Sequence, residues 1–262
     1  MKKQKICIIG GGLTGLITAI ALSRLNVKID LISSSNKHNI KSNRTTAISE
    51  KNYNFLKKLK IMEFTKKEFW PCSKMKLYTE RENEDFKEIL DLGDNKKKKN
   101  ILYMMKNSQL SKHIQSYIVK NPQISHKTNK TISKIISSGL LKSIKLKNGS
   151  DNKYNLIIVC TGNKSNIVKS FSHNEIYNSP YNEISITTIL QHTALQNNIT
   201  RQIFLKEGVV AFLPISNSRT SIVWSIKKNI FNKHKGKKNL YFKNKIKFFA
   251  KKFTKNAQIV SS

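Results

Sequence analysis

The feature that most constrains this chain is a glycine-rich turn close to its start. Residues 5–9, Lys-Ile-Cys-Ile-Ile, form an apolar run typical of a buried strand, and Gly10-Gly-Gly-Leu-Thr-Gly15 follows directly. From Thr14 to Leu25 the apolar residues recur at helical spacing, and Val27–Ser33 then alternates as a second strand. The order strand, glycine turn, helix and strand predicts the first unit of a Rossmann-like α/β fold.

The spacing within this turn indicates a nucleotide-binding function. Gly10, Gly12 and Gly15 fit the pattern G-x-G-x-x-G, in which the glycines allow a tight turn, close approach of a pyrophosphate, and packing of helix against strand. Leu13 and Thr14 open the helix, where free N–H groups and a partial positive charge face the phosphates. We therefore predict a dinucleotide site; a plain turn in a parallel sheet is the alternative.

One residue of the usual site is replaced. The acid expected at the end of the second strand, which would bond the adenosine ribose, is Ser33 in this chain. A serine hydroxyl still offers one hydrogen bond to a ribose hydroxyl, although a weaker one than a carboxylate. We include Ser33 in the predicted site, but this position does not distinguish FAD from NAD.

Length and composition narrow the class of protein. The 262 residues allow one large domain or two ordinary ones, and no apolar run approaches the roughly 18 residues of a membrane-spanning helix. The basic start breaks into glycine too early for an export signal. Cys7, Cys72 and Cys160 have no metal-like spacing, and the six histidines show no ligand pairing. We expect reduced thiols, no metal centre and a cytoplasmic protein.

The net charge of +34 at pH 7 raises the question of nucleic-acid binding. Only five of the 49 basic residues are arginine, the side chain whose planar fork reads bases and clamps phosphates, and the lysines are scattered over the whole chain. Lysine, asparagine and isoleucine are abundant together, as an AT-rich coding sequence would produce. We therefore regard a nucleic-acid partner as the less favoured interpretation.

The second half of the chain shows mainly strand patterns and closes with a basic helix at about 240–253. Phe242, Ile246, Phe249 and Phe253 form one stripe of this helix, surrounded by lysines. Such a helix can lie on an anionic membrane surface, but packing against its own sheet is the favoured interpretation. Gly93–Asn100, which contains four consecutive lysines, is predicted to be a solvated loop.

Four stretches in order resemble the FAD-dependent aromatic-ring monooxygenases, in particular the branch that hydroxylates ubiquinone precursors on a para-hydroxybenzoate hydroxylase-like fold. They are the glycine turn, Arg44-Thr-Thr-Ala-Ile-Ser49, Leu102-Tyr-Met-Met-Lys-Asn107, and the segment from Arg201 through Gly208-Val-Val-Ala-Phe-Leu-Pro214 to Trp224. The last stretch is the most specific, because its Phe, Gly, Ala-x-Leu-Pro and Val-Trp positions recur at the family's intervals. The resemblance covers nearly all of the chain.

The resemblance implies an FAD-binding domain at residues 1–65 and 100–170, interleaved with a sheet-rich substrate domain at 66–99 and 171–262. It implies hydroxylation of a prenylated phenol with O2 and NAD(P)H, and it leaves the catalytic residues unknown because the flavin does most of the chemistry. The alternatives are a flavin- or NAD-dependent dehydrogenase without oxygen chemistry, and a non-catalytic basic protein that binds a membrane or nucleic acid.

The resemblance also names further site residues. It implies that Arg44, Asn107 and Gly162 approach the cofactor, and that Phe212, Pro214 and Trp224 line the substrate pocket; a surface arginine, a capping asparagine and core aromatics are the respective alternatives. Possible partners are a lipophilic phenol, the inner membrane face, where a peripheral association is implied, and other enzymes of quinone synthesis.

The chain departs from the family pattern in two places. The Asp-Gly pair that follows the family's apolar strand is here Thr161-Gly162. The family also continues for about another hundred residues, through a Gly-Asp motif that closes over the flavin, and we therefore expect this chain to correspond to an N-terminal fragment that binds FAD at best weakly.

Overall fold

The structure is a computed structural model, and it describes residues 3–35, 44–60, 68–82, 85–93, 99–162, 165–171, 179–234, 236 and 238–261. The chain divides into two compact units, each assembled from separated segments. The first unit contains residues 1–40, 58–62 and 108–178, and the second contains 41–57, 63–107 and 179–262. The predicted loop at Gly93–Asn100 lies largely outside the described residues.

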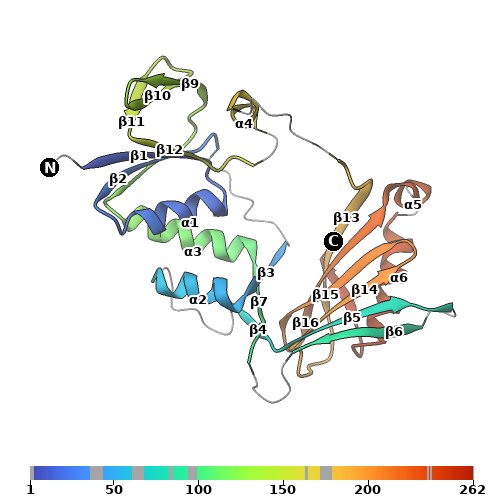
Figure 1. The fold of residues 1–262 in the computed structure, drawn as a ribbon. Helices are drawn as coiled ribbons and strands as arrows, with labels where there is room; N and C mark the ends of the chain where they lie inside the picture. The colour runs from blue at the N-terminus through green and yellow to red at the C-terminus, as the bar shows by residue number, and fades with distance from the viewer. Residues whose placement is uncertain are drawn as a thin grey trace. The chain divides into compact units, whose positions relative to one another are not determined.

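A parallel sheet forms the centre of the first unit (Figure 1). Its strand order is β12-β1-β2-β8, with β1 (Gln4–Ile9) between β12 (Leu156–Val159) and β2 (Val27–Ile32), and β8 (Ile124–Lys127) at one edge. Apolar side chains such as Ile8 and Leu31 are fully buried in these strands. The continuous apolar runs of the sequence therefore form strands that are covered on both faces, as predicted.

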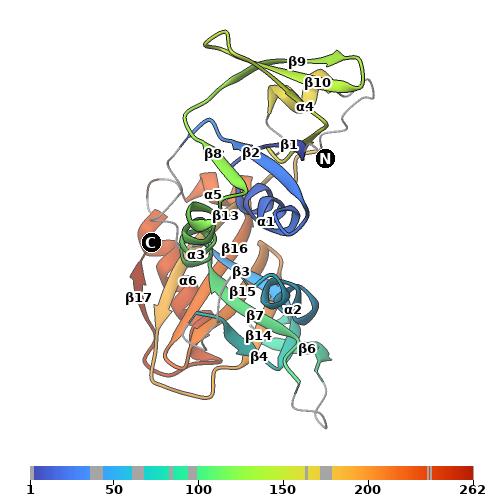
Figure 2. The same cartoon turned by 90° about the vertical axis from the view of Figure 1, so that its left-hand side faces the viewer.

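Helices cover one face of this sheet and a small sheet covers the other. Figures 1 and 2 both show α1 (Leu13–Leu22) and α3 (Asn107–Lys120) side by side on one face. Leu16 and Ile20 of α1 and Ile114 of α3 are fully buried. The antiparallel sheet on the other face consists of β9 (Ile132–Ser138), β10 (Leu141–Leu146) and β11 (Asp151–Tyr154), and the short helix α4 (Asn166–Phe171) follows β12.

The second unit contains a seven-stranded sheet of order β17-β13-β16-β15-β14-β5-β6. Its strands are antiparallel except for the pair β14 and β5, which is parallel. The bounds are β5 (Lys74–Glu80), β6 (Phe86–Leu92), β13 (Glu183–Gln191), β14 (Ile199–Leu205), β15 (Gly208–Ser216), β16 (Arg219–Lys227) and β17 (Gln258–Ser261).

Helix α6 (Lys238–Lys251), which follows the short helix α5 (Lys228–Lys233), packs on one face of this sheet. Phe242, Ile246 and Phe249 are buried against Trp224, and the Trp224 ring meets the Phe242 and Phe249 rings edge to face at 5.6 and 5.7 Å. The apolar stripe of the basic helix is therefore core, as the favoured interpretation predicted.

A three-stranded sheet of order β3-β7-β4 completes the second unit. It joins β3 (Thr45–Ser49), β7 (Leu102–Lys106) and β4 (Trp70–Cys72), and α2 (Glu50–Lys58) follows β3 directly. Tyr53 of α2 stacks on Tyr103 of β7, with ring centroids 3.9 Å apart.

The predicted α/β fold with a parallel sheet and a separate sheet-rich part is confirmed. The boundaries differ from the expected ones, because β3 pairs with β7 and β4 and so places residues 41–57 and 100–107 with the larger sheet. Among the helices in the described part of the chain, none has the length and apolarity needed to cross a membrane.

Candidate functional site

The glycine turn lies between β1 and α1, at the carboxyl end of the parallel strands. Gly10 has φ of +120°, a conformation that L side chains rarely adopt, and a Cβ there would overlap the carbonyl oxygen of Cys160. A Cβ at Gly15 would overlap the carbonyl oxygen of Gly10. These two glycines are therefore required for the close packing of β1, α1 and the end of β12.

Gly12 differs from its two neighbours in the motif. It is exposed, its φ of −75° is open to any residue, and a Cβ there would meet nothing within 4 Å. The packing of the chain therefore does not explain a glycine at this position. The open space beside Gly12 fits a group that approaches the backbone from outside, as a pyrophosphate does in this motif.

The start of α1 supplies the matching electrostatics. Gly12 accepts the first intrahelical hydrogen bond from the Leu16 N–H at 3.0 Å, so the N–H groups of Leu13, Thr14 and Gly15 precede the helical ladder. The first turn carries no acidic side chain, and Gly12 provides no side-chain cap. The helix N-terminus therefore keeps its donors and its partial positive charge for an anion.

Thr161 and Gly162 follow β12 beside the glycine turn. The N–H of Cys160 donates to the Ile9 carbonyl at 2.7 Å, which holds the end of β12 against the end of β1. The Oγ1 atom of Thr161 is buried and has no hydrogen-bond partner within the described residues. A buried hydroxyl is normally paired, so this atom offers a hydrogen bond to a group bound at the turn.

Ser33 lies at the end of β2, where the sequence places it, and the structure pairs it with a residue that the sequence analysis missed. Its Oγ is 3.1 Å from Nε2 of His126, which lies on the neighbouring strand β8. Ser33 is buried and His126 is half-buried. The two residues are far apart in the chain, so only the strand order brings them together.

A buried carboxylate stabilises the same sheet. Asp30 of β2 accepts hydrogen bonds from Lys127 Nζ at 2.9 Å and from the Tyr154 hydroxyl at 2.7 Å, and Lys5 Nζ lies 3.1 Å away. Burial by itself would raise the pKa of Asp30, but these hydrogen bonds outweigh it and lower the pKa below its usual value. Asp30 is therefore a structural anion, and it is not available to a ribose.

Two other predicted residues come together in the second unit. The N–H of Asn107 donates to the Arg44 carbonyl at 3.0 Å, and the Thr46 hydroxyl donates to Asn107 Oδ1. Arg44 is exposed and Asn107 is half-buried, at the point where β7 passes into α3. Thr45, which follows Arg44 in the chain, has a buried Oγ1 without a partner in the described part of the chain.

The predicted substrate residues lie mainly in the core. Phe212 is 2% exposed and Trp224 is 0% exposed, and both belong to the cluster under α6; Pro214 is also buried. Since side chains alternate along a strand, the residues next to them face the opposite side of the sheet. The structure thus gives Phe212 and Trp224 a packing role, which is the alternative that the sequence analysis stated.

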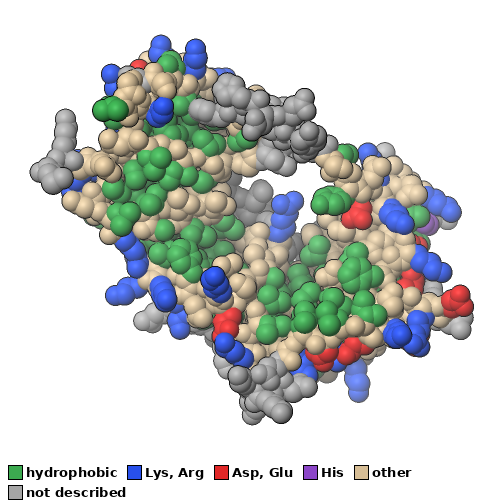
Figure 3. Space-filling view, in the orientation of Figure 1, with side chains coloured by type: hydrophobic (Ala, Val, Ile, Leu, Met, Phe, Trp, Pro, Cys, Tyr) green, Lys and Arg blue, Asp and Glu red, His purple; other side chains and the backbone are tan. Residues whose placement is uncertain are grey.

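The opposite face of the seven-stranded sheet carries a row of apolar side chains. The apolar residues Leu90, Leu77, Ala211 and Val223 lie in register across the strands, interrupted by the polar Gln202 on β14, and Phe204 lies two residues along β14 from Gln202. Leu90 is 43% exposed and Phe204 is 38% exposed. Figure 3 shows hydrophobic side chains gathered over this sheet.

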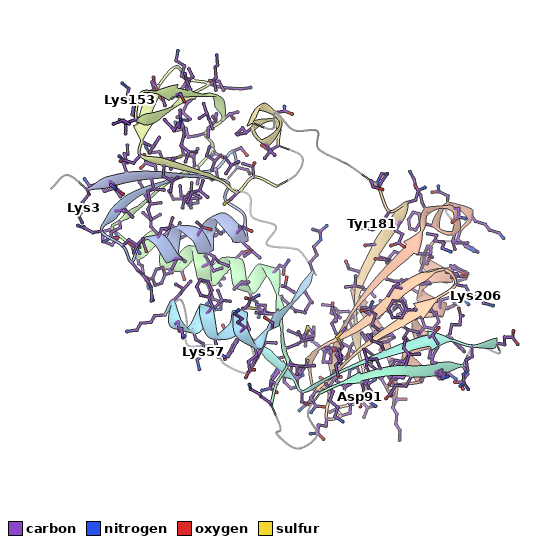
Figure 4. All side chains as sticks on the ribbon, in the orientation of Figure 1. Lys3, Lys57, Asp91, Lys153, Tyr181 and Lys206 are labelled. Carbon is purple, nitrogen blue, oxygen red and sulfur yellow. The ribbon has the colours of Figure 1, made fainter. Side chains whose placement is uncertain are left out.

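A surface hollow of about 570 Å³ lies elsewhere in the second unit. Tyr181, which projects before β13 (Figure 4), lines it together with Asn182, Glu183, Lys227 and Lys228. None of the predicted site residues lines this hollow. Among the described residues, no group of three or more histidine, cysteine or acidic side chains could hold a metal ion.

Comparison with known proteins shows which solved structures have a similar fold. No protein-family model matches the chain, and no curated protein matches it. A solved structure described as PqsL, a probable FAD-dependent monooxygenase from Pseudomonas aeruginosa, superposes with a TM-score of 0.74 at 12% identity, covering 88% of this chain and 63% of that one.

Two further structures agree. The p-nitrophenol 4-monooxygenase PnpA from Pseudomonas putida DLL-E4 gives a TM-score of 0.71 at 13% identity, covering 99% of this chain and 67% of PnpA. The tetrameric form of 2-methyl-3-hydroxypyridine-5-carboxylic acid oxygenase gives 0.75 at 13% identity, covering 100% of this chain and 70% of the oxygenase. The chain thus shares the fold of these three solved structures, the first of which is described as a probable FAD-dependent monooxygenase, and it spans about 63% of the length of PqsL.

Proposed function

We propose that this chain forms the dinucleotide-binding and sheet-rich parts of an FAD-dependent monooxygenase. The single observation that carries the proposal is the glycine turn, where Gly10 and Gly15 are needed for packing and Gly12 is not. An open glycine at a helix start is what a bound pyrophosphate needs, because its oxygens must approach the backbone closely. The similarity of the fold to solved FAD-dependent monooxygenases supports this proposal.

The residues of the first unit would hold the ADP half of FAD. The N–H groups at Leu13 and Thr14 would bond the phosphates, Thr161 Oγ1 would donate its unused hydrogen bond, and Ser33 would contact the adenosine ribose. Arg44 and Asn107 are proposed as further cofactor contacts on the resemblance alone, since both resemble family positions near the flavin. When bound, reduced FAD supplies the activation of O2, with NAD(P)H as the reductant.

For the substrate we propose a lipophilic phenol, and more narrowly a prenylated phenol of ubiquinone synthesis. The narrower proposal depends on the resemblance of the strand segment Arg201–Trp224. The sheet face that carries Phe204, Ala211 and Val223 supports an apolar ring as the ligand, because these side chains retain exposed or half-buried apolar surface. Phe212 and Trp224 would support this face from behind.

Titration of the purified chain with FAD tests the cofactor proposal. We expect quenching of flavin fluorescence and a higher melting temperature, because a ligand that binds only the folded state stabilises it. Gly12→Ala is the matched control, since it blocks the approach of the phosphates without disturbing packing. Unchanged fluorescence together with an unchanged melting temperature would exclude the proposed cofactor.

Oxygen consumption separates the proposed reaction from dehydrogenation. A monooxygenase consumes O2 when NAD(P)H and a phenol are both supplied, and the hydroxylated product accumulates. Oxidation of NAD(P)H with transfer of electrons to an added dye, but without hydroxylation of the phenol, would instead identify a dehydrogenase.

A further inference from the structure

The carboxyl end of β2 carries a serine where this kind of fold usually has a carboxylate, and a histidine of the neighbouring strand β8 lies beside it. Ser33 Oγ lies 3.1 Å from His126 Nε2. The Ser33 N–H donates to the Lys127 carbonyl at 3.0 Å, and the Ser33 carbonyl accepts from the Lys130 N–H at 3.0 Å. Backbone bonds on both sides therefore fix the Ser33–His126 pair against the end of β8.

The charges around this pair favour an anion. Asp30 is the single acid in the sequences of β2 and β8, and its carboxylate is already bonded to Lys127 and Tyr154. Lys130 is exposed on the turn that follows β8. The end of β2 therefore presents a hydroxyl beside an imidazole, and the one carboxylate of the two strands is paired with Lys127.

We propose that the Ser33–His126 pair recognises the adenosine ribose and accepts a phosphate on its 2′ position as readily as a free 2′-hydroxyl. A carboxylate at this place accepts hydrogen bonds from ribose hydroxyls and repels a 2′-phosphate. In the tautomer in which His126 Nε2–H donates to Ser33 Oγ, the Ser33 hydroxyl can donate to either group. This inference depends on the proposed function, because it requires that the glycine turn binds the 5′-phosphates.

Isothermal titration of the full 262-residue chain with 5′-AMP and with adenosine 2′,5′-bisphosphate, which differ only in the 2′-phosphate, tests the inference. We expect the Kd of the bisphosphate to lie within about threefold of that of 5′-AMP, or below it. Ser33→Asp should raise the ratio of the bisphosphate Kd to the 5′-AMP Kd at least about tenfold. Ser116→Asp, which adds the same charge at an exposed position of α3, should leave this ratio unchanged.

A second variant keeps the test decisive if Ser33→Asp does not fold. His126→Ala should weaken binding of the bisphosphate about fivefold relative to 5′-AMP. An unaltered chain that binds 5′-AMP but binds the bisphosphate at least about tenfold more weakly would overturn the inference and leave the proposed function intact. An unchanged ratio in His126→Ala would also overturn it, and binding of neither nucleotide would overturn both proposals.

Discussion

The three glycines of the turn are needed for different physical reasons, although the sequence motif does not distinguish them. Gly10 and Gly15 lie where a Cβ would overlap backbone carbonyl oxygens, whereas Gly12 borders open space. Substitutions in the same motif should therefore separate folding from ligand binding.

We predict that Gly12→Ala changes the free energy of unfolding by no more than about 1 kcal/mol, because its φ suits alanine and only the helix cap weakens. The same change should weaken 5′-ADP binding at least about tenfold, since the methyl group occupies the path of the phosphates. Urea unfolding and isothermal titration measure the two effects.

Gly15→Ala is the companion experiment. It should lower the free energy of unfolding by about 1–3 kcal/mol or more, because α1 must move away from β1 to admit the methyl group. Equal losses of stability in Gly12→Ala and Gly15→Ala would contradict the claim that packing requires Gly15 but not Gly12.

The elements of the first unit are joined by one buried carboxylate, which belongs to β2 and bonds side chains from β1, β8 and β11. We predict that Asp30→Asn lowers the free energy of unfolding at pH 7 by about 2–3 kcal/mol, because charged hydrogen bonds are lost and the Tyr154 hydroxyl keeps a poorer acceptor. Urea unfolding at several pH values measures this loss.

The pH dependence of Asp30 has a definite sign. Its pKa is lower in the folded than in the unfolded state, so its contribution is complete above about pH 4 and disappears as the pH falls through the folded pKa. The difference between Asp30→Asn and the unaltered chain should therefore shrink in acid. Asp85→Asn, at an exposed carboxylate that pairs with Lys252, should have a much smaller effect.

Helix α6 provides a prediction about the second unit. Phe249→Ala should lower the free energy of unfolding by about 3–5 kcal/mol, because the ring is buried against Trp224 and Phe86. Leu240→Ala on the same helix should cost no more than about 0.5 kcal/mol, since Leu240 is 66% exposed. A Phe249→Ala protein that is fully stable but binds anionic vesicles less tightly would show that the stripe contacts a membrane.

The sequence predicts elements with strong periodicity better than it predicts contacts between them. The unit β1, α1 and β2 follows directly from apolar runs and glycine spacing. Strand β3, Thr-Thr-Ala-Ile-Ser, lacks an apolar alternation and becomes a strand only because β7 pairs with it. The partnership of Ser33 with His126 depends on strand order, which no local pattern encodes.

At the scale of the whole molecule, the charge of +34 should produce binding to polyanions without selectivity. Lysine and arginine side chains on the face shown in Figure 3 are spread over the surface and do not gather in one patch. We predict equal affinity for unrelated DNA duplexes and a loss of about 100-fold or more when salt rises from about 50 to 200 mM. A strong preference for one sequence, measured by fluorescence anisotropy, would contradict this.

The parallel pairing of β1 with β12 has a consequence for biosynthesis. Ile6 pairs with Leu156, so the backbone groups on one edge of β1 stay unpaired until the ribosome has added 150 more residues. At roughly 5–20 residues per second this delay is about 8–30 s. During that time the nascent chain carries an apolar strand with unsatisfied backbone groups on one edge, which makes it a natural client for ribosome-associated chaperones.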